Sequence, residues 1–404
     1  MLPEDMRRFR LIEDVFRSCC RGWGYQEVRT PSLEYLHLFT ATGTLIPSML
    51  GRVYSFLDWD GWSGERVVLR PDGTIPLARL FISNLPERKL ARLYYVTNVF
   101  VFETTGTENR EKWQCGAEFL GSGELVADVE IILLATEVLH NLGFSNSKVS
   151  LSHAGVVKAL LRELNLEPEE ETKALTQILE GNWQVFTETK ALKPPLGEFL
   201  PQLLRIVGKS KDFLENFRAV CPTTSVNLRA NLDNFIGVTE LLDTLGYKYK
   251  INLKSLPGFE YYTGVCFEIL IDDRKVGGGG RYDDLIPLLG GGNIPACGFA
   301  LYVDPLADLL LVKLGDKVER GVLIKGKTET IEGVTACFYL AQVLRQAGYI
   351  AELDFVGQKT TDWRWLITVS ERELPLFIVF DRDTNQTKRA TSAAEVLNLI
   401  GGFT

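Results

Sequence analysis

Four consecutive glycines, Gly277–Gly280, constrain this chain more than any other feature. They follow a β-branched and aromatic run at 265–271, which predicts a strand. Because glycine has no Cβ, such a run lets the backbone approach a neighbouring group closely. Upstream, residues 256–264 read Leu-Pro-Gly-Phe-Glu-Tyr-Tyr-Thr-Gly. Two tyrosines and a glutamate beside a glycine turn predict a small polar pocket, and a glycine-rich bulge beside a buried tyrosine pair is the alternative.

The order of these pieces resembles the second half of the histidyl-tRNA synthetase catalytic domain. The family motifs are an arginine with Gly-Leu-Asp-Tyr-Tyr-Thr-Gly, then Gly-Gly-Gly-Arg-Tyr-Asp, then Gly-Phe-Ala and a closing Glu-Arg. This chain keeps the tyrosine and glycine parts, with Tyr261, Tyr262, Tyr282 and Gly-Phe-Ala at 298–300. The resemblance implies that the three tyrosines line a histidine-binding site.

Several arginines of that family are missing here. Pro257 stands at the arginine before the tyrosine motif, and Pro305 at the arginine of the closing pair. The family's Phe-Arg-x-Glu, whose arginine binds the ATP α-phosphate, reads Phe-Val-Phe-Glu at 100–103, so Val101 replaces the arginine. The loop that follows has two arginines in the family, and only Arg110 is kept. The resemblance therefore marks Val101, Pro257 and Pro305 as lost ATP-site positions.

The N-terminal region has the order expected of the first class II synthetase motif. Apolar spacing predicts a helix over 4–23, closed by Gly24-Tyr25. A strand is expected from Gln26 to Thr30, ending at Pro31. In the family this helix and strand build a dimer interface, while an amphipathic helix followed by a core strand is the plainer interpretation.

The segment 69–76 reads Leu-Arg-Pro-Asp-Gly-Thr-Ile-Pro, between a predicted strand hairpin (52–60 and 66–70) and a helix from Leu77. The family has Leu-Arg-Pro-Glu-Gly-Thr here, and its acid and threonine hold the α-amino group of the amino acid. An ammonium group needs anionic or hydroxyl acceptors, which Asp72 and Thr74 provide. Helix capping by either residue is the alternative.

The next predicted strand, 113–121, places polar side chains on one face. Alternation puts Gln114, Gly116 and Glu118 on the same side. A glutamine and a glutamate that flank a glycine predict a ligand-sized gap, and an inward carboxylate is unusual for pure core. In the family this glutamine and glutamate contact histidine, the glutamate reaching its imidazole. A solvent-exposed face is the alternative.

Three further residues have local explanations. Asp128 and Glu130 lie at the start of a helix predicted to run to Leu142, where acidic side chains suit the helix dipole. His153 follows a strand at 149–152 and precedes another helix. It resembles a small-residue–histidine turn of the family, and capping of that helix is the favoured role.

The resemblance covers nearly the whole chain and implies an α+β fold. We expect a class II synthetase-like antiparallel sheet flanked by helices over 1–316, with a helical insertion at about 165–250. A small C-terminal α/β domain at 317–404 stands where the family has its anticodon-binding domain. Residues 318–404 contain 10 Lys/Arg and 11 Asp/Glu, a net of −1. A tRNA-gripping surface is normally basic, so this charge weakens that function.

Composition excludes several other classes of protein. With 46% hydrophobic and 24% charged residues, the 404-residue chain is typical of globular proteins of two or three domains. Its net charge of −8 argues against a broad nucleic-acid surface. Neither a signal peptide nor an apolar run near the roughly 18 residues of a membrane helix is seen. Seven cysteines without a CxxC pair predict buried thiols in a reducing cytoplasm, with no metal site.

The missing arginines decide the predicted function. Amino-acid activation needs fixed positive charge at the phosphate, and each lost donor costs about 10² to 10³ in rate. The histidine side of the site is kept, a pattern that resembles the ATP phosphoribosyltransferase regulatory subunits, which are synthetase paralogues. The resemblance implies no catalysis and no cofactor, activation of a short-form catalytic subunit, histidine feedback, a dimer and a hetero-oligomer. A functional histidyl-tRNA synthetase with displaced arginines, using Arg110 or Arg281, is the alternative. A stand-alone pseudo-synthetase is a third possibility.

Overall fold

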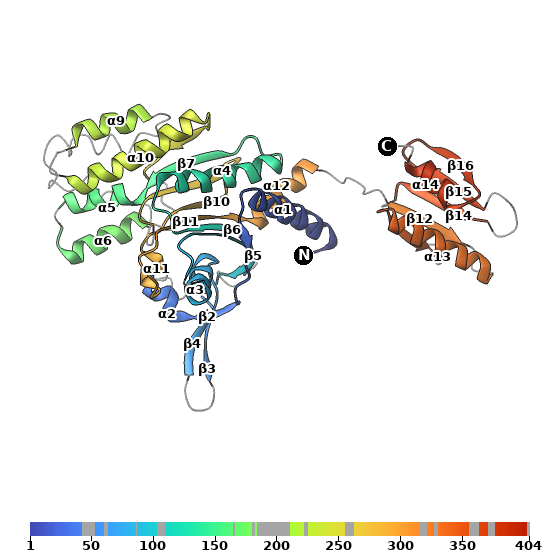
Figure 1. Cartoon of the computed structure of the whole chain (residues 1–404), viewed down its shortest axis with the longest axis horizontal. Coiled ribbons are helices and arrows are strands. Elements are labelled where there is room, and N and C mark those ends of the chain that lie inside the picture. Colours follow the sequence, from blue (N-terminus) through green and yellow to red (C-terminus); the bar gives the residue numbers. More distant parts are fainter. Residues whose placement is uncertain are drawn as a thin grey trace. The chain divides into compact units, whose positions relative to one another are not determined.

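The computed structural model divides into two compact units, Met1–Leu311 and Val312–Thr404, each with its own hydrophobic core. The two units are described separately (Figure 1). The expected boundary at 316 lies outside the described residues. The described residues are 1–42, 53–59, 64–85, 87–102, 110–164, 166–179, 182–183, 211–221, 225–254, 262–314, 321–326, 330–354, 363–370 and 376–401.

An eight-stranded sheet forms the centre of the first unit. Its strands are β1 (Gln26–Glu27), β5 (Ala91–Phe100), β6 (Glu111–Leu120), β7 (Lys148–His153), β8 (Tyr249–Ile251), β9 (Val265–Ile271), β10 (Arg274–Arg281) and β11 (Ala296–Tyr302). Their order is β1-β5-β6-β11-β10-β9-β7-β8. The five inner pairings are antiparallel, and only the outermost strands β1 and β8 pair in parallel. The predicted α+β class with an antiparallel sheet is confirmed.

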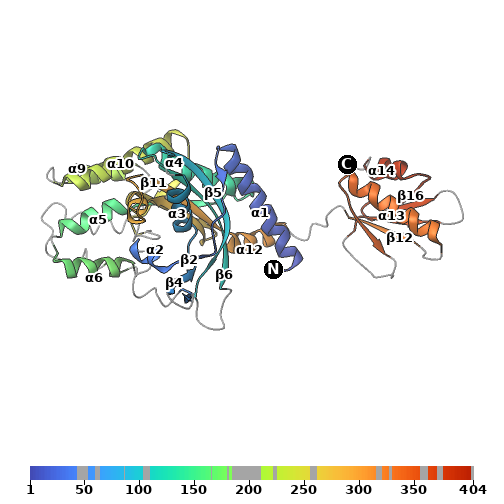
Figure 2. The ribbon, with the colours of Figure 1, turned by 60° about the horizontal axis from the view of Figure 1, so that its bottom comes forward.

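Helices cover this sheet and supply residues to the site. They are α1 (Pro3–Gly22), α2 (Leu36–Ala41), α3 (Thr74–Asn84), α4 (Leu125–Asn141), α5 (Ala154–Glu163), α6 (Pro168–Leu179), α9 (Lys211–Val220), α10 (Val226–Thr244), α11 (Leu285–Leu288) and α12 (Val303–Leu314). Figure 1 shows α3 and α4 on opposite sides of the sheet. Figure 2 shows α5, α6, α9 and α10 gathered at one side of the unit. Apart from β8, the described elements of the expected insertion are helical.

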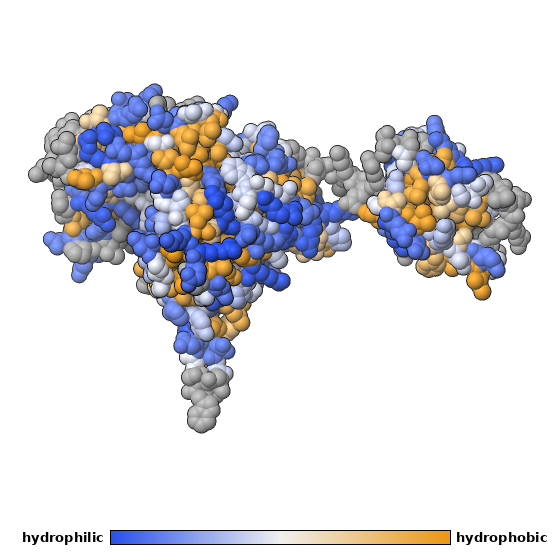
Figure 3. Space-filling model, in the orientation of Figure 1, coloured by the Kyte–Doolittle hydropathy of each residue, from blue (hydrophilic) through white to orange (hydrophobic). Residues whose placement is uncertain are grey.

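A second, three-stranded sheet projects from this unit (Figure 1). It contains β2 (Leu33–Tyr35), β3 (Ser55–Trp59) and β4 (Gly64–Leu69) in the order β2-β4-β3. The hairpin predicted from the sequence is therefore confirmed. Figure 3 shows hydrophobic residues scattered among hydrophilic ones on the face of the molecule seen there.

The glycine run of β10 packs against its neighbouring strands. A Cβ on Gly279 would lie 2.2 Å from the carbonyl oxygen of Gly298, and one on Gly280 would lie 2.6 Å from that of Val265. Since β9 and β11 flank β10, these close approaches are made by the sheet itself. The glycine run therefore serves strand packing.

The second unit is a five-stranded mixed sheet with two described helices. Its elements are β12 (Gly321–Gly326), α13 (Ile331–Gln346), β13 (Ile350–Asp354), β14 (Trp365–Val369), β15 (Phe377–Asp381), β16 (Gln386–Ala390) and α14 (Ala393–Gly401). In the order β13-β12-β14-β15-β16, the first three strands are parallel and the last two antiparallel.

Candidate functional site

Glu118 is the centre of the candidate site. It lies near the end of β6 and is fully buried, at 0% exposure. The Thr74 hydroxyl donates to its Oε1 at 2.7 Å, and the Tyr282 hydroxyl donates to its Oε2. Three residues named from the sequence thus meet from three separate segments. The alternative of a solvent-exposed strand face is wrong at this position.

Burial controls the protonation of this carboxyl. Desolvation raises the pKa of Glu118 to about 8, although the hydrogen bonds from Tyr282 and Thr74 act in the opposite direction. The nearby Asp72 carboxylate raises it further. A ligand that brings a donor or a positive charge stabilises the ionised form, because it replaces the solvation lost on burial.

The expected gap above Gly116 is occupied by Tyr95. The two residues are directly paired across β5 and β6. A Cβ on Gly116 would lie 2.2 Å from the Tyr95 ring, and one on Gly73 would lie 2.4 Å from it. The prediction of an empty space at this glycine is therefore wrong, because a neighbouring aromatic ring fills it.

Two buried side-chain oxygens on the neighbouring strands β5 and β6 have no hydrogen-bond partner among the described residues. They are the Tyr95 hydroxyl on β5 and Oε1 of Gln114 on β6. Buried polar atoms in native proteins are nearly always paired with protein, water or ligand. Tyr95 was missed in the sequence analysis, and its pairing with Gly116 is the signal that identifies it.

Asp72 performs the capping role that the sequence left open. Its Oδ1 accepts from the backbone N–H of Ile75 at 2.8 Å, in the first turn of α3. Burial raises the pKa of the Asp72 carboxyl, while backbone N–H groups of Ile75, Thr74 and Gly73 lower it. This capping contact also explains why α3 begins at Thr74, three residues before the predicted start.

Tyrosines form another wall of the site. The rings of Tyr262 and Tyr282 lie 6.4 Å apart between centroids, at an interplanar angle of 46°. Tyr262 is 6% exposed and Tyr282 is 1% exposed. Tyr261 and Pro257 lie outside the described residues.

Two of the three lost arginine positions, Val101 and Pro305, lie among the described residues. The N–H of Val101 donates to the carbonyl oxygen of Arg110 at 3.1 Å, which extends the β5–β6 pairing. The Arg110 guanidinium lies 5.0 Å from the centroid of the Phe102 ring. Pro305 lies in the first turn of α12, where the preceding Asp304 accepts from the N–H of Trp113 at 3.1 Å.

Comparison with known proteins shows the family of the chain. The model described as histidyl-tRNA synthetase matches residues 1–306. An ATP phosphoribosyltransferase regulatory subunit of Dehalococcoides mccartyi (strain ATCC BAA-2266 / KCTC 15142 / 195) is 46% identical over 403 residues, covering 100% of this chain and 97% of the relative. The chain belongs to the family of ATP phosphoribosyltransferase regulatory subunits.

More distant matches include histidine–tRNA ligases and structures of the same fold. A histidine–tRNA ligase of Methanocaldococcus jannaschii is 32% identical over 390 residues, covering 92% of this chain and 90% of the relative. A crystal structure described as an ATP phosphoribosyltransferase regulatory subunit/histidyl-tRNA synthetase from Bacillus halodurans C is 27% identical. It has a TM-score of 0.77 and covers 91% of this chain and 95% of its own. The family resemblance read from the sequence is confirmed.

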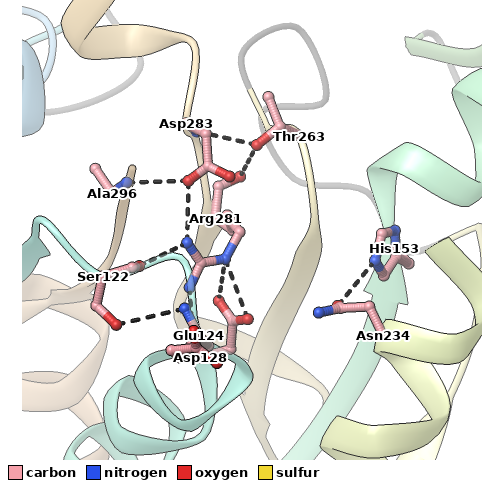
Figure 4. A network of polar contacts seen from close by, with 9 residues as sticks. All are labelled: Ser122, Glu124, Asp128, His153, Asn234, Thr263, Arg281, Asp283 and Ala296. Atoms are coloured by element: carbon pink, nitrogen blue, oxygen red, sulfur yellow. Dashed lines mark hydrogen bonds and ion pairs between the residues drawn. The ribbon is translucent and has the colours of Figure 1, made fainter. Parts of the chain in front are cut away.

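Arg281 does not replace the arginines that this regulatory subunit lacks. Its side chain is buried and pairs with Asp128, Nε lying 2.9 Å from Oδ1 (Figure 4). It also donates to the carbonyl oxygens of Ser122 and Glu124. The interpretation of Asp128 as a helix-dipole residue misses this partner, which lies 153 residues away in the chain.

His153 caps α5, as favoured from the sequence. Its Nδ1 accepts from the N–H of Val156 at 3.2 Å, and Nε2 lies 3.3 Å from Oδ1 of Asn234 (Figure 4). Burial lowers the pKa of His153 to about 4, so the ring is neutral. The histidine therefore has a structural role.

The remaining expectations concern cysteines, metals and membranes. All seven cysteines are free and buried, as predicted. Among the described residues, no three or more His, Cys, Asp or Glu side chains are grouped to hold a metal ion. Over the same part of the chain, no helix is long and apolar enough to cross a membrane.

Proposed function

We propose that this regulatory subunit binds free histidine at the Glu118 site. It then activates a short-form ATP phosphoribosyltransferase catalytic subunit and relays histidine feedback to it. The similarity to ATP phosphoribosyltransferase regulatory subunits of Dehalococcoides mccartyi supports the choice of the regulated enzyme. The chemistry of the Glu118 site supports the choice of histidine as the ligand.

The site offers groups that match both ends of a histidine molecule. An imidazole N–H donates to the Glu118 carboxylate, whose ionised form it stabilises. The rings of Tyr262 and Tyr282 flank the imidazole, and the α-amino group meets acceptors on Thr74 and Asp72. The proposed histidine-binding residues are Asp72, Thr74, Gln114, Glu118, Tyr261, Tyr262 and Tyr282.

We also propose that the chain does not activate histidine with ATP. The side chains of Val101, Pro257 and Pro305 cannot donate a hydrogen bond to phosphate. Arg281 is committed to Asp128, so it supplies no replacement charge. The observation that carries the proposal is this contrast between a buried polar histidine site and an ATP side with uncharged side chains at the arginine positions.

Calorimetry on the full chain tests histidine binding. We expect saturable binding of free histidine at or below millimolar concentration, and no binding of an amino acid without the imidazole ring, such as alanine. Absence of histidine binding at millimolar ligand would mean that the kept pocket is vestigial. Co-purification with a short catalytic subunit, its activation, and inhibition of the complex by histidine test the regulatory role.

The second candidate is a functional histidyl-tRNA synthetase, favoured by the 32% identity to the Methanocaldococcus jannaschii ligase. Aminoacylation of histidine tRNA by the purified chain decides for this candidate. A stand-alone pseudo-synthetase is supported if no catalytic subunit associates. The near-neutral C-terminal unit argues against strong tRNA binding.

The family motif at the N-terminal end of the chain supports a proposal for the assembly. We propose that residues 24–31 take part in a dimer interface and that the dimer joins a cytoplasmic hetero-oligomer with the catalytic subunit. Light scattering of the chain alone and with the partner measures both steps. A strictly monomeric chain at micromolar concentration contradicts the dimer.

A further inference from the structure

A buried ion pair lies next to the proposed histidine site, on the other side of the sheet. Arg281 is the last residue of β10, and Tyr282 directly follows it. In the sheet register Arg281 pairs with Cys297, which pairs with Phe119, whereas Glu118 pairs with Gly298. Neighbouring residues of a strand point to opposite faces. Arg281 therefore lies on the face covered by α4, and Tyr282 lies on the face of Glu118.

Arg281 ties together three segments of the first unit (Figure 4). Its Nε donates to both carboxylate oxygens of Asp128, at 2.9 and 3.1 Å. Nη1 donates to the Ser122 carbonyl at 2.9 Å and to Asp283 Oδ1 at 3.0 Å, and Nη2 to the Glu124 carbonyl at 3.2 Å. All three guanidinium nitrogens are thus used, with 5% of the arginine and 1% of the Asp128 side chain exposed.

The backbone around Arg281 holds both described tyrosines of the site. The N–H of Thr263, directly after Tyr262, donates to the Arg281 carbonyl at 2.8 Å. The N–H of Tyr282 donates to the Ala296 carbonyl at 2.8 Å, and the Ala296 N–H donates to Asp283 Oδ1 at 3.0 Å. The strand end that presents the Tyr282 hydroxyl to Glu118 is therefore fixed on both sides.

We propose that the Asp128–Arg281 pair is a positioning element for the ligand site: it fixes the end of β10 so that the Tyr282 hydroxyl lies on the Glu118 carboxyl. Neither side chain touches the ligand. This inference rests on the proposed function only for the ligand, histidine, since the contact between Tyr282 and Glu118 is present without it.

Loss of an ion pair that only stabilises the fold is expected to leave Tyr282 in place, whereas loss of a positioning pair is expected to move it. Arg92 and Glu130 provide the comparison, because Glu130 lies on the same helix and accepts from Arg92 at 2.7 and 2.9 Å. That pair has no contact with Arg281 or Tyr282 among those described. Asp128→Asn and Glu130→Gln each remove one carboxylate from α4, so the two variants form a matched set.

The first measurement needs no ligand. We label the full chain with 3-fluorotyrosine and assign the Tyr282 fluorine resonance by its absence from Tyr282→Phe. The resonance is expected to move in Asp128→Asn and to stay in place in Glu130→Gln. An unmoved resonance in folded Asp128→Asn overturns the proposal, whether or not the chain binds histidine.

The second measurement is a double-mutant cycle on histidine affinity. Loss of one hydrogen bond to the site corresponds to about a tenfold weaker affinity, and we expect this for Asp128→Asn and for Tyr282→Phe. If Asp128 acts through Tyr282, the double variant binds about as weakly as Tyr282→Phe alone. Losses that multiply, or an unchanged affinity in Asp128→Asn, overturn the proposal.

A milder variant keeps the test valid if Asp128→Asn does not fold. Asp283→Asn removes one carboxylate partner of Arg281 at a side chain that is 37% exposed. It is expected to move the same fluorine resonance and to weaken histidine binding less than tenfold. An unmoved resonance in this variant also contradicts the proposal. If the wild-type chain binds no histidine, the proposed function fails, while the fluorine measurement still decides the positioning role.

Discussion

The proposed histidine-binding residues, called the histidine half below, and the positions where the family has its ATP-site arginines, called the ATP half, use their side chains in opposite ways. On the histidine half, Thr74, Glu118 and Tyr282 are buried and bonded to one another. On the half that the family uses for ATP, Val101 and Pro305 stand at arginine positions, within a strand pairing and a helix turn. The difference teaches that the sheet and helices of this fold remain complete without the charges that activation requires.

Two buried arginines, Arg70 and Arg281, strengthen this contrast. Arg70 is 3% exposed and donates to backbone carbonyls of Thr30, Pro31 and Asn98. Arg281 is likewise held by Asp128. Both arginines stabilise connections between segments, so their presence in the sequence does not indicate phosphate binding. The two arginines connect segments of the chain, and the buried Glu118 carboxyl is the group proposed to bind the ligand.

The largest effect is expected from replacing the Glu118 carboxyl at the centre of the histidine half. Glu118→Gln keeps the shape but replaces charge-assisted hydrogen bonds with neutral ones, a loss of up to about 3 kcal/mol, or roughly 100-fold in affinity. Calorimetry with histidine measures it. Glu130→Gln is the matched control and is expected to bind like the wild type. Equal affinity in the two variants would remove Glu118 from the site.

The raised pKa of Glu118 predicts a pH dependence of stability. Its pKa is about 8 in the folded chain and near 4.5 when unfolded. The folded state therefore binds the extra proton between these values, and stability falls as pH rises from about 4.5 through 8. Between pH 6 and pH 8 the loss is on the order of 2 kcal/mol.

Unfolding curves of the wild type and Glu118→Gln at pH 6 and pH 8 measure this difference. The variant cannot ionise at this position, so the decline attributable to Glu118 is absent. Asp128, whose pKa burial raises to about 6, acts in the same direction at lower pH. Identical pH dependence in both proteins contradicts the buried, protonated carboxyl.

A smaller effect is expected from crowding the carboxyl. A Cβ on Gly298 would lie 1.6 Å from Glu118 Oε2, so Gly298→Ala must displace the carboxyl from Tyr282. Overpacking of this kind costs about 1–3 kcal/mol, and we expect histidine affinity to fall about tenfold. Gly123→Ala is the control, because its Cβ would meet only Pro295, at 3.7 Å. Wild-type affinity in Gly298→Ala would mean that the carboxyl has another position that binds equally well.

The comparison also separates what the sequence predicts from what it does not. Motif order predicted the class of fold, and strand alternation placed Glu118 on an inward face. His153 was interpreted correctly because its capping partner, Val156, is three residues away. Local spacing of this kind can be read from one chain.

Contacts between distant segments could not be read in the same way. Tyr95 fills the space above Gly116 only because of the pairing register of β5 with β6. Arg281 and Asp128 meet across 153 residues. A single sequence does not show such partners. It therefore predicts an empty space at Gly116 and an available positive charge at Arg281.

The smallest effect is expected from returning one charge to the ATP half. Val101→Arg adds a guanidinium at a half-buried strand end, where one ion pair contributes up to about 1 kcal/mol, so ATP affinity is expected to rise roughly threefold. Val126→Arg adds the same charge at a position that is 59% exposed on α4 and is the control.

Histidine-dependent pyrophosphate exchange should remain undetectable in Val101→Arg. Two arginine positions, Pro257 and Pro305, are still without charge, and each such donor is worth about 10² to 10³ in rate. Equilibrium binding of ATP and exchange kinetics therefore answer different questions: the first reports local charge, the second the complete phosphate site. Pyrophosphate exchange in the wild-type chain would show that other groups stabilise the phosphate in the ATP half. The two halves would then differ in their residues but not in the chemistry that they can support.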